Sequence, residues 1–492
     1  MEKYINVIGG GLAGTEAAYQ IAKRGIPVKL YEMKPLHFSP AHTNKNLAEI
    51  VCSNSFKSNL LTNACGLLKE ELRKLDSLLI KIADETKVPA GQALAVDRDE
   101  FSRRVTEEIE NNANIEIIHQ EIGESIDLKD IIKNNITIIA TGPLTSEKLA
   151  KQIQELTGED KLYFYDAAAP ILTKESIDFS IAFYGNRYEQ EKKKDETIEE
   201  WEKRINTDNL NKKKQQTESM LNESQQEKSY INLPMSKEEY DCFWQALVEA
   251  EVVTLHEFEK REIFEGCMPI EVMAKRGIDT LRFGPLKPVG FDDPRTVKRP
   301  YAIVQLRQDD KQAELYNIVG FQTNLKFGEQ KRVFQMIPGL QNAEFVKYGV
   351  MHRNTYINSS KLLDETYNLK SNPNVYFAGQ ITGVEGYVES ISSGMVAALN
   401  AINDVLGTEE KTSRIIDSIS SNRTQTTKDK VIFSKNTIIG SLAKYISTPN
   451  DKFQPMNANF GILPELDGKK IKDKKLRYQM MAERSLRDIL TV

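Results

Sequence analysis

Two of the four cysteines stand in segments whose composition favours an irregular, polar backbone. Cys52 lies in the sequence EIVCSNSF, and Cys267 lies between a glycine and a proline, with two cations shortly after it. The thiolate is the reactive form of cysteine, and an ordinary thiol with a pKa of about 8.5 needs help to reach it. These two thiols are candidates for nucleophilic or acid–base chemistry, whereas Cys65 and Cys242, within apolar and helical patterns, are expected to be small buried side chains.

The sequence from Gly9 to Glu32 has the spacing of a turn that holds a dinucleotide. Its GxGxxG glycines follow a short apolar strand and open a helix, so the backbone can approach a pyrophosphate at the helix N-terminus. Glu32 ends the next strand, where its carboxylate can accept hydrogen bonds from ribose hydroxyls and disfavours a 2′-phosphate. The residues expected to bind the nucleotide are Gly9, Gly10, Gly11, Leu12, Ala13, Gly14 and Glu32.

Two later strands also end in small, glycine-containing turns. One ends at Thr141 and Gly142, and the other ends at Gly379 and Gln380, with a helix predicted to follow from Glu389. These two motifs resemble the second and third fingerprints of flavoproteins in the glutathione-reductase superfamily, so FAD is the expected cofactor. No second GxGxxG follows a strand, and a reduced nicotinamide would therefore have to reach the flavin directly.

Composition limits the classes of protein to which the chain can belong. Its 492 residues are 40% hydrophobic and 28% charged, which is typical of a soluble globular protein. No apolar run approaches the ~18 residues of a membrane span, and the N-terminus runs straight into the first strand, so we expect a cytoplasmic protein. The cysteines include no CxxC pair, so neither a disulfide framework nor a metal site is expected. The net charge of −5 gives no general attraction to nucleic acid.

The order of predicted elements indicates an α/β fold. We expect a Rossmann-type FAD-binding domain of the glutathione-reductase superfamily with an inserted α+β domain. The FAD-binding domain is placed at residues 1–165 and 335–440, and the inserted substrate or RNA domain at residues 166–334. Residues 441–492 are expected to form a C-terminal helical segment.

Three helical or charged stretches outside the flavin motifs are also predicted. Apolar periodicity predicts a helix at about residues 67–86 and another at residues 98–109. Residues 187–229, rich in Glu, Lys, Gln and Asn, cannot bury much surface and are expected to be a charged insertion in a surface loop. Residues 466–490 are expected to form a helical stretch with a basic face.

Long strings distributed along the chain are similar to those of the folate- and FAD-dependent RNA uracil-5-methyltransferase family. They are GGGLAGTEAA, EIVCSNSFKSN, LAVDRDEFS, FEGCMPIEVMAKRG, RPYAIVQLRQDD, YNIVGFQTNLKFGEQKRVF, YGVMHRNTYIN, FAGQITGVEGYVES and FQPMNANFG. The resemblance covers nearly the whole chain. The charged stretch at residues 187–229 is longer than the family's usual connection, which leaves the choice of target RNA open.

The resemblance implies a methyl transfer to carbon 5 of uridine in RNA. Methylenetetrahydrofolate would be the carbon donor, reduced FAD the reductant, and NAD(P)H the source of electrons for the flavin. Because carbon 5 of uracil is a poor nucleophile, a thiolate is expected to add at carbon 6, and a base then removes the hydrogen from carbon 5. Cys267 is assigned as the nucleophile and Cys52 as its acid/base partner, and this assignment could be reversed.

The folate and the RNA each need further side chains. Candidates for the folate pocket are His352, Glu385 and Tyr387. Phosphate contacts are expected from Lys287, Arg295, Lys298 and Arg299, with the basic C-terminal stretch extending the same track. A uridine inside a folded loop would have to be splayed out to reach the flavin.

Several alternatives for function stay open. The T-loop uridine of tRNA is the favoured target, and relatives that methylate a 23S ribosomal RNA uridine perform the same chemistry. The chain could instead be a flavin oxidoreductase acting on a small molecule, in which Cys52 tunes the flavin. It could also be a non-catalytic flavin-bearing RNA-binding protein, in which the flavin serves folding.

Overall fold

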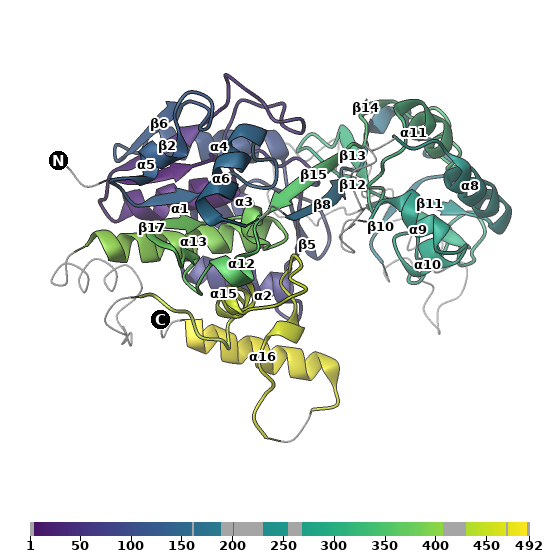
Figure 1. Ribbon diagram of the computed structural model, residues 1–492. Helices are drawn as coiled ribbons and strands as arrows, with labels where there is room; N and C mark the ends of the chain where they lie inside the picture. Colours follow the sequence, from purple (N-terminus) through teal and green to yellow (C-terminus); the bar gives the residue numbers. More distant parts are fainter. Residues whose placement is uncertain are drawn as a thin grey trace.

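The computed structural model contains two six-stranded sheets, each at the centre of its own domain (Figure 1). It describes residues 4–159, 162–187, 200, 230–253, 268–406, 430–468 and 471–489, with the backbone alone at 162–167 and 351–353. All but two residues of the expected charged insertion at 187–229 lie outside this description. The antiparallel pair β8 (Leu162–Ala167) and β15 (Met351–Tyr356) lies between the two sheets in Figure 1 and connects them.

The first sheet has the order β16-β17-β7-β1-β2-β6 and confirms the expected Rossmann-type domain. Its parallel strands are β1 (Ile5–Ile8), β2 (Val28–Glu32), β6 (Ile115–His119), β7 (Thr137–Ile139) and β17 (Asn372–Phe377). The short edge strand β16 (Asn368–Leu369) pairs antiparallel with β17. All four residues of β1 are buried, as expected for a central parallel strand covered on both faces.

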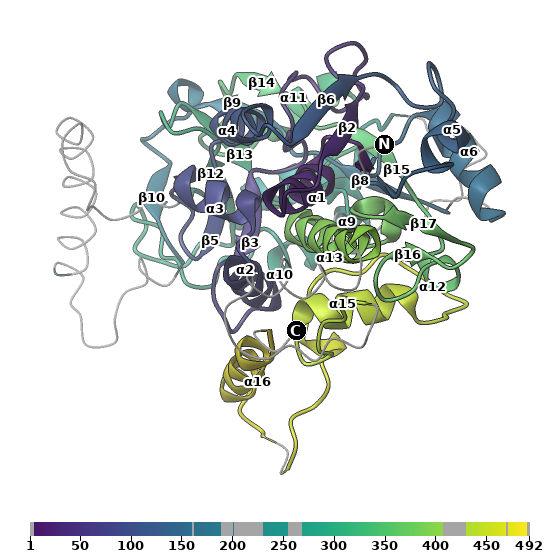
Figure 2. The same cartoon turned by 90° about the vertical axis from the view of Figure 1, so that its left-hand side faces the viewer.

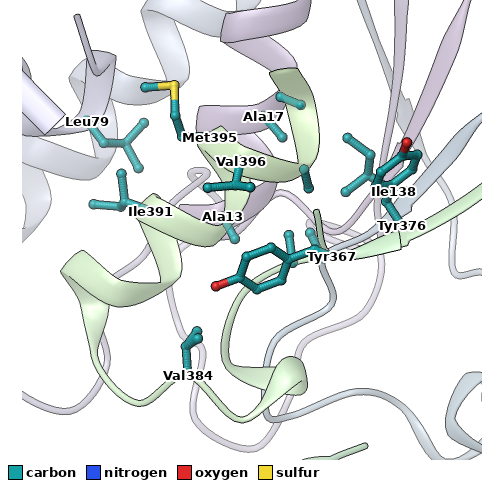
Figure 3. Close-up of a cluster of buried hydrophobic side chains, with 14 of the residues drawn as sticks. Ala13, Ala17, Leu79, Ile138, Tyr367, Tyr376, Val384, Ile391, Met395 and Val396 are labelled. Carbon is teal, nitrogen blue, oxygen red and sulfur yellow. The ribbon is translucent and has the colours of Figure 1, made fainter. Parts of the chain in front are cut away.

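Helices α1 (Leu12–Lys23) and α13 (Tyr387–Val405) pack against each other beside this sheet. Figure 3 shows Ala13 and Ala17 of α1 close to Val396 and Met395 of α13, with Ile138 of β7 nearby. A Cβ on Gly394 would lie only 2.3 Å from the carbonyl oxygen of Ala13. Glycine at that position therefore allows the two helices to approach closely.

The prediction of a single helix at residues 67–86 is wrong. Two helices stand there, α2 (Ala64–Lys74) and α3 (Leu78–Glu85), separated by Asp76 with a φ of 57°. The side chain of Ser77 then caps α3 by accepting a hydrogen bond from the N–H of Ile80. The apolar periodicity continues across this break, so the sequence pattern does not reveal it.

Helix α4 (Arg98–Glu110) confirms the second predicted helix. A small sheet of β3 (Ser55–Ser58), β4 (Lys87–Val88) and β5 (Ala93–Val96) also belongs to this part of the chain.

The inserted domain is an antiparallel sheet covered by short helices, and its order is β10-β11-β12-β13-β9-β14. The strands are β9 (Ile171–Thr173), β10 (Phe183–Gly185), β11 (Tyr230–Met235), β12 (Ala302–Gln308), β13 (Leu315–Ile318) and β14 (Phe345–Lys347). The helices are α8 (Lys237–Glu249), α9 (Ile270–Lys275), α10 (Thr280–Phe283) and α11 (Phe327–Phe334). Strand β14 pairs with β9 and so belongs to this sheet, although it lies beyond the expected domain boundary at residue 334. The domain has a hydrophobic core of its own.

The C-terminal segment packs onto the FAD-binding domain, as Figures 1 and 2 show for α15 (Ile438–Ser447) and α16 (Lys474–Asp488). Residues of both helices belong to the same hydrophobic core as the Rossmann sheet. The fully buried carboxylate of Glu71 in α2 accepts hydrogen bonds from the N–H groups of Ile438 and Ile439 and from the Ser485 hydroxyl. Helix α16 begins later than the predicted residue 466. Among the described helices, none is long and apolar enough to cross a membrane.

Candidate active site

A cleft at the carboxyl ends of the parallel strands brings the three glycine motifs together. It is open to solvent and is lined by Gly9–Ala13 after β1, Thr141 and Gly142 after β7, and Gly379 and Gln380 after β17. Open α/β sheets bind ligands in this position. Three segments that are far apart in the sequence therefore line one site.

The glycines of the first motif fall into two groups, those where a side chain would collide with the backbone and one that faces the cleft. A Cβ on Gly9 would lie 2.5 Å from the carbonyl oxygen of Ala140, and a Cβ on Gly14 would lie 1.8 Å from that of Gly9. A Cβ on Gly11, in contrast, would meet no protein atom within 4 Å, and Gly11 lines the cleft. Gly11 is also the N-cap of α1 and has no side-chain cap, so N–H groups of the first helical turn can bind an anion. This arrangement fits the pyrophosphate of a dinucleotide.

The carboxylate of Glu32 holds the turn together from inside the cleft. Its Oε2 accepts a hydrogen bond from the N–H of Gly10 at 2.7 Å, and its Oε1 accepts one from the N–H of Lys34 at 2.9 Å. The side chain is buried and lines the cleft. A carboxylate has about four acceptor positions, so Glu32 retains capacity for a ribose hydroxyl.

Cys52 lies in the loop after β2, beside the cleft. Its neighbour Val51 lines the cleft, and so does Tyr387, the first residue of α13. The N–H groups of Cys52 and Ser53 both donate to the hydroxyl oxygen of Tyr387, at 3.0 and 3.1 Å. Burial raises the pKa of Tyr387, and the neighbouring Cys52 adds to this effect. The phenol therefore stays neutral and anchors the cysteine loop to the helix that follows the third glycine motif.

Two arginines, Arg98 and Arg307, form hydrogen bonds that connect the Cys52 loop to other elements. Arg98 of α4 forms a bidentate ion pair with Asp309 at 2.9–3.1 Å and donates to the carbonyl of Ile50 at 3.0 Å. Burial is the largest single effect and opposes the charge of Arg98, but the charge and hydrogen bonds of Asp309, together with Tyr387 and Cys52, raise the pKa of the guanidinium overall. Arg307 of β12 donates to Ser53 Oγ at 2.6 Å. Burial lowers the pKa of Arg307. The inserted domain thus contacts the loop directly through Arg307, and Asp309 of the same domain holds Arg98, which contacts the loop from the other side.

Comparisons with known proteins agree with this architecture. The family model described as "Glucose inhibited division protein A" matches residues 4–223 and 200–409. The "Methylenetetrahydrofolate--tRNA-(uracil-5-)-methyltransferase TrmFO" of Acetivibrio thermocellus is 54% identical over 488 residues, which are 99% of this chain and 98% of that protein. The protein of the same name from Staphylococcus carnosus is 51% identical over 487 residues, or 99% of this chain and 97% of the relative. The chain belongs to the TrmFO family.

A solved structure supports the fold of this TrmFO family member. The crystal structure of Aquifex aeolicus GidA (form II) aligns with a TM-score of 0.63 at 16% identity, and the alignment covers 100% of this chain and 74% of that one. At such low identity the likeness shows the fold alone. Together with the family match, it confirms the expected Rossmann-type fold.

The structure describes only some of the side chains predicted for the TrmFO site. Cys267 and the side chain of His352 lie outside the description; the backbone of His352 pairs with Asp166 in the β15–β8 ladder. Glu385 is buried, and its carboxylate accepts a hydrogen bond from the side chain of Gln380. Tyr387 lines the cleft, as already described.

The two cysteines expected to be buried differ. Cys65 is buried in α2, and burial raises the pKa of its thiol to about 11. Cys242 is exposed, which corrects the expectation for that residue. Helix α8 buries the face that carries Tyr240, Phe243 and Leu247, and Cys242 falls on the opposite face. Helical periodicity alone did not reveal which face would be covered.

The predicted phosphate contacts stand in loops of the inserted domain, and one of them has a competing partner. Arg295 forms an ion pair with Asp293 at 2.9 Å, so much of its charge is neutralised within the protein. Lys287 is exposed. Any role of these residues in RNA binding remains a prediction.

Sequence reasoning missed the charged residues around Cys52. Arg98, Arg307, Asp309 and Lys347 were not predicted to belong to the site. Two of them lie in the string RPYAIVQLRQDD, which carries the family resemblance but contains no pattern with a known chemical role. Only the pairing of β12 in the inserted sheet brings them to the cysteine loop.

Proposed function

We propose that this chain forms 5-methyluridine in tRNA, with methylenetetrahydrofolate as the carbon donor and FAD as its bound redox cofactor. The observation that carries the proposal is identity above 50% over nearly the full length to proteins whose names state this activity. The cleft supports it, because it offers backbone donors for a pyrophosphate and has a thiol beside it.

The reaction replaces the hydrogen on carbon 5 of uracil by a methyl group. A thiolate adds to carbon 6, the resulting enolate attacks the methylene carbon of the folate through carbon 5, and a base removes the carbon 5 hydrogen as a proton. Cleavage of the bond between the methylene carbon and the folate nitrogen releases tetrahydrofolate and leaves an exocyclic methylene on carbon 5. Its conversion to a methyl group needs two electrons and a proton, which reduced FAD would supply when it is bound. Release of the thiolate from carbon 6 completes the exchange.

The protein groups in this scheme are two thiols and a folate pocket. We assign Cys267 as the nucleophile and Cys52 as the acid/base partner, with the reverse assignment as the alternative. Cys52 is suited to either role because its loop adjoins the cleft through Val51 and Tyr387. His352, Glu385 and Tyr387 are our candidates for holding the folate.

We further propose that NAD(P)H reduces the flavin directly, since only one dinucleotide motif follows a strand. The substrate RNA is tRNA, as the names of the relatives state for those proteins. Because the proposed substrate is tRNA, we propose that the protein acts in the cytoplasm. The target uridine is splayed out of the T loop so that carbon 5 reaches the cleft.

The test uses the full chain loaded with FAD, an unmodified tRNA transcript, NADPH and methylenetetrahydrofolate labelled in its methylene carbon. Mass spectrometry of the digested RNA should show labelled 5-methyluridine. The Cys267→Ala and Cys52→Ala variants should each lose this product. Cys242→Ala, which removes an exposed thiol on α8, should retain wild-type activity.

Two outcomes would contradict the proposal. Absence of labelled product on tRNA, together with product on a ribosomal RNA fragment, would move the activity to another substrate. Normal methylation by Cys267→Ala would exclude that residue as the nucleophile.

A further inference from the structure

The loop that carries Cys52 is held on both sides by guanidinium groups, of which that of Arg307 is buried and that of Arg98 is partly buried. Arg98 donates to the carbonyl of Ile50, two residues before the cysteine, at 3.0 Å. Arg307 donates to the hydroxyl of Ser53, the residue after it, at 2.6 Å. Arg98 belongs to α4 of the FAD-binding domain and Arg307 to β12 of the inserted domain. The loop on either side of Cys52 is therefore held by two cations from different domains, and both are close enough to act on Cys52 electrostatically.

The two arginines differ in what neutralises them. Arg98 has a counterion, because its Nε and Nη2 both reach the carboxylate of Asp309. Arg307 donates to neutral oxygens: Asn54 Oδ1 at 3.0 Å, Ser53 Oγ at 2.6 Å and Asn317 Oδ1 at 3.2 Å. Among the described residues, no carboxylate pairs with it. A buried charge without a counterion is costly, so the guanidinium is poised to stabilise an anion beside it.

A third cation lies close enough to act on Cys52 and Arg98 electrostatically. Lys347 ends β14 of the inserted sheet and is partly buried, and its ammonium has no hydrogen-bond partner among the described residues. Burial lowers the pKa of Lys347, and the charge of Arg98 lowers it further, while the charges of Glu49 and Cys52 act in the opposite direction. An anion near Cys52 would relieve the mutual repulsion of these cations.

The acidic groups near the cysteine loop already form ion pairs with other cations. Asp309 is paired with Arg98, and Glu49, in the same loop as Cys52, lies 3.4 Å from the ammonium of Lys34. Tyr387, from α13, is a neutral phenol that receives two backbone N–H groups. Among the residues that the structure describes, the charged groups near Cys52 therefore carry an excess of positive charge.

We propose that Arg307, assisted by Lys347, holds Cys52 in its thiolate form, so that docking of the inserted domain generates the reactive sulfur. The step is an ionisation in which the S–H bond breaks, the electron pair stays on sulfur and the proton goes to solvent. Arg307 is a positioning residue, because it contacts Ser53 and Asn54 rather than substrate. The inference deepens the proposed function, which needs a reactive thiol, but the ionisation exists in the resting protein and is measured without turnover.

The test is the rate at which iodoacetamide alkylates Cys52 in the FAD-loaded full chain, measured across a pH range by mass spectrometry of the peptide that contains it. In the wild-type protein the midpoint of this rate against pH should lie below the value of about 8.5 for an ordinary thiol. Arg307→Met should raise the midpoint by at least one unit and slow alkylation at neutral pH about tenfold. Arg307→Lys, which keeps the charge, should recover most of the wild-type rate.

Two further variants separate charge at the site from charge in general. Lys347→Met should raise the midpoint by a smaller amount and should leave folding intact, since the side chain is only partly buried. Lys326→Met removes a cation from the same domain, where it pairs with Glu251 at the surface, and should not move the midpoint. Flavin absorbance and circular dichroism report whether each variant is folded.

The inference is overturned by a wild-type midpoint at or above that of an ordinary thiol, or by an unchanged midpoint in a folded Arg307→Met protein. If that variant does not fold, an unchanged midpoint in Lys347→Met overturns it instead. A protein that shows these shifts but methylates no RNA would contradict the proposed function and leave the charge effect standing.

Discussion

The two sheets of this molecule contribute different kinds of group to the candidate active site. The parallel sheet presents backbone: its glycine turns and the N-terminus of α1 line the cleft, and the one buried acid there, Glu32, mainly orders the turn. The antiparallel sheet contributes charged side chains. Arg307 of β12 contacts the cysteine loop of the other domain, and Lys347 of β14 lies near it. A cleft built largely from backbone thus adjoins a cysteine loop that a separate domain supplies with charged side chains.

The largest effect should come from the backbone site. Gly14→Val places side-chain atoms where the carbonyl of Gly9 already stands, since even a Cβ would lie 1.8 Å from that oxygen. We expect loss of bound FAD, measured as loss of flavin absorbance, and destabilisation of about 3 kcal/mol or more in urea unfolding. Gly328→Ala in α11, where a Cβ meets nothing within 4 Å, is the matched control and should bind FAD normally. Full flavin occupancy in Gly14→Val would contradict the assignment of this turn.

The second prediction concerns the separate cores. Phe321 is fully buried in the inserted domain, with its ring centroid 5.3 Å from that of Phe334, so Phe321→Ala should destabilise that domain by about 3–5 kcal/mol. Both tryptophans, Trp201 and Trp244, belong to the inserted segment of the sequence, and Trp244 lies in α8. Tryptophan fluorescence therefore follows the inserted domain through Trp244, while flavin fluorescence reports on the other domain. Tryptophan emission should change at lower urea than flavin emission.

The matched variant for the first core is Ile391→Ala in α13, which is also fully buried. It should release the flavin at lower urea, with a loss of about 2–5 kcal/mol, and should affect tryptophan emission less. If both probes shift together in both variants, the two domains unfold as one cooperative unit and the comparison fails.

The third prediction addresses the ion pair between the domains. Arg98 and Asp309 are 14% and 5% exposed, so Arg98→Met leaves a buried carboxylate without its partner and should cost about 3 kcal/mol. Asp309→Asn should cost less, because the amide carries no charge. The exposed pair Arg332–Glu329 is the control, and Arg332→Met should change the unfolding free energy by only about 0.5 kcal/mol. Equal losses in Arg98→Met and Arg332→Met would remove the argument that the boundary depends on buried charge.

The smallest predicted effect is a pH dependence at the C-terminal segment. Burial raises the pKa of Glu71 to about 7, above its unfolded value of about 4.5. Between these values the folded protein binds more protons than the unfolded chain, so the contribution of this group to stability falls as pH rises from about 4.5 to 7 and is constant above that. The total change should not exceed about 3 kcal/mol.

Urea unfolding at several pH values measures this slope. Glu71→Gln cannot ionise, so its free energy of unfolding should depend less on pH than that of the wild-type protein between about pH 5 and 7. Glu483→Gln, which replaces an exposed carboxylate on α16, should keep the wild-type slope. Parallel curves for wild type and Glu71→Gln would show that this carboxylate does not titrate in the window.

The sequence determined the parts of the molecule whose physical causes are local. Glycine spacing between a strand and a helix predicted the dinucleotide turn, because a Cβ at Gly9 or Gly14 would collide with nearby backbone. Strand and helix periods predicted β1, β2 and α4, and the long family strings predicted the family. The break at Asp76 was missed because apolar periodicity runs through it.

Only the tertiary structure decided what surrounds Cys52. Arg307 and Ser53 are 254 residues apart, and Tyr387 is 335 residues from Cys52, so neither contact leaves a periodic signal in the sequence. The same holds for Cys242, whose exposure depends on which face of α8 the inserted sheet covers. Backbone turns are set by neighbouring residues, whereas the charge around a thiol is set by the way in which two domains pack.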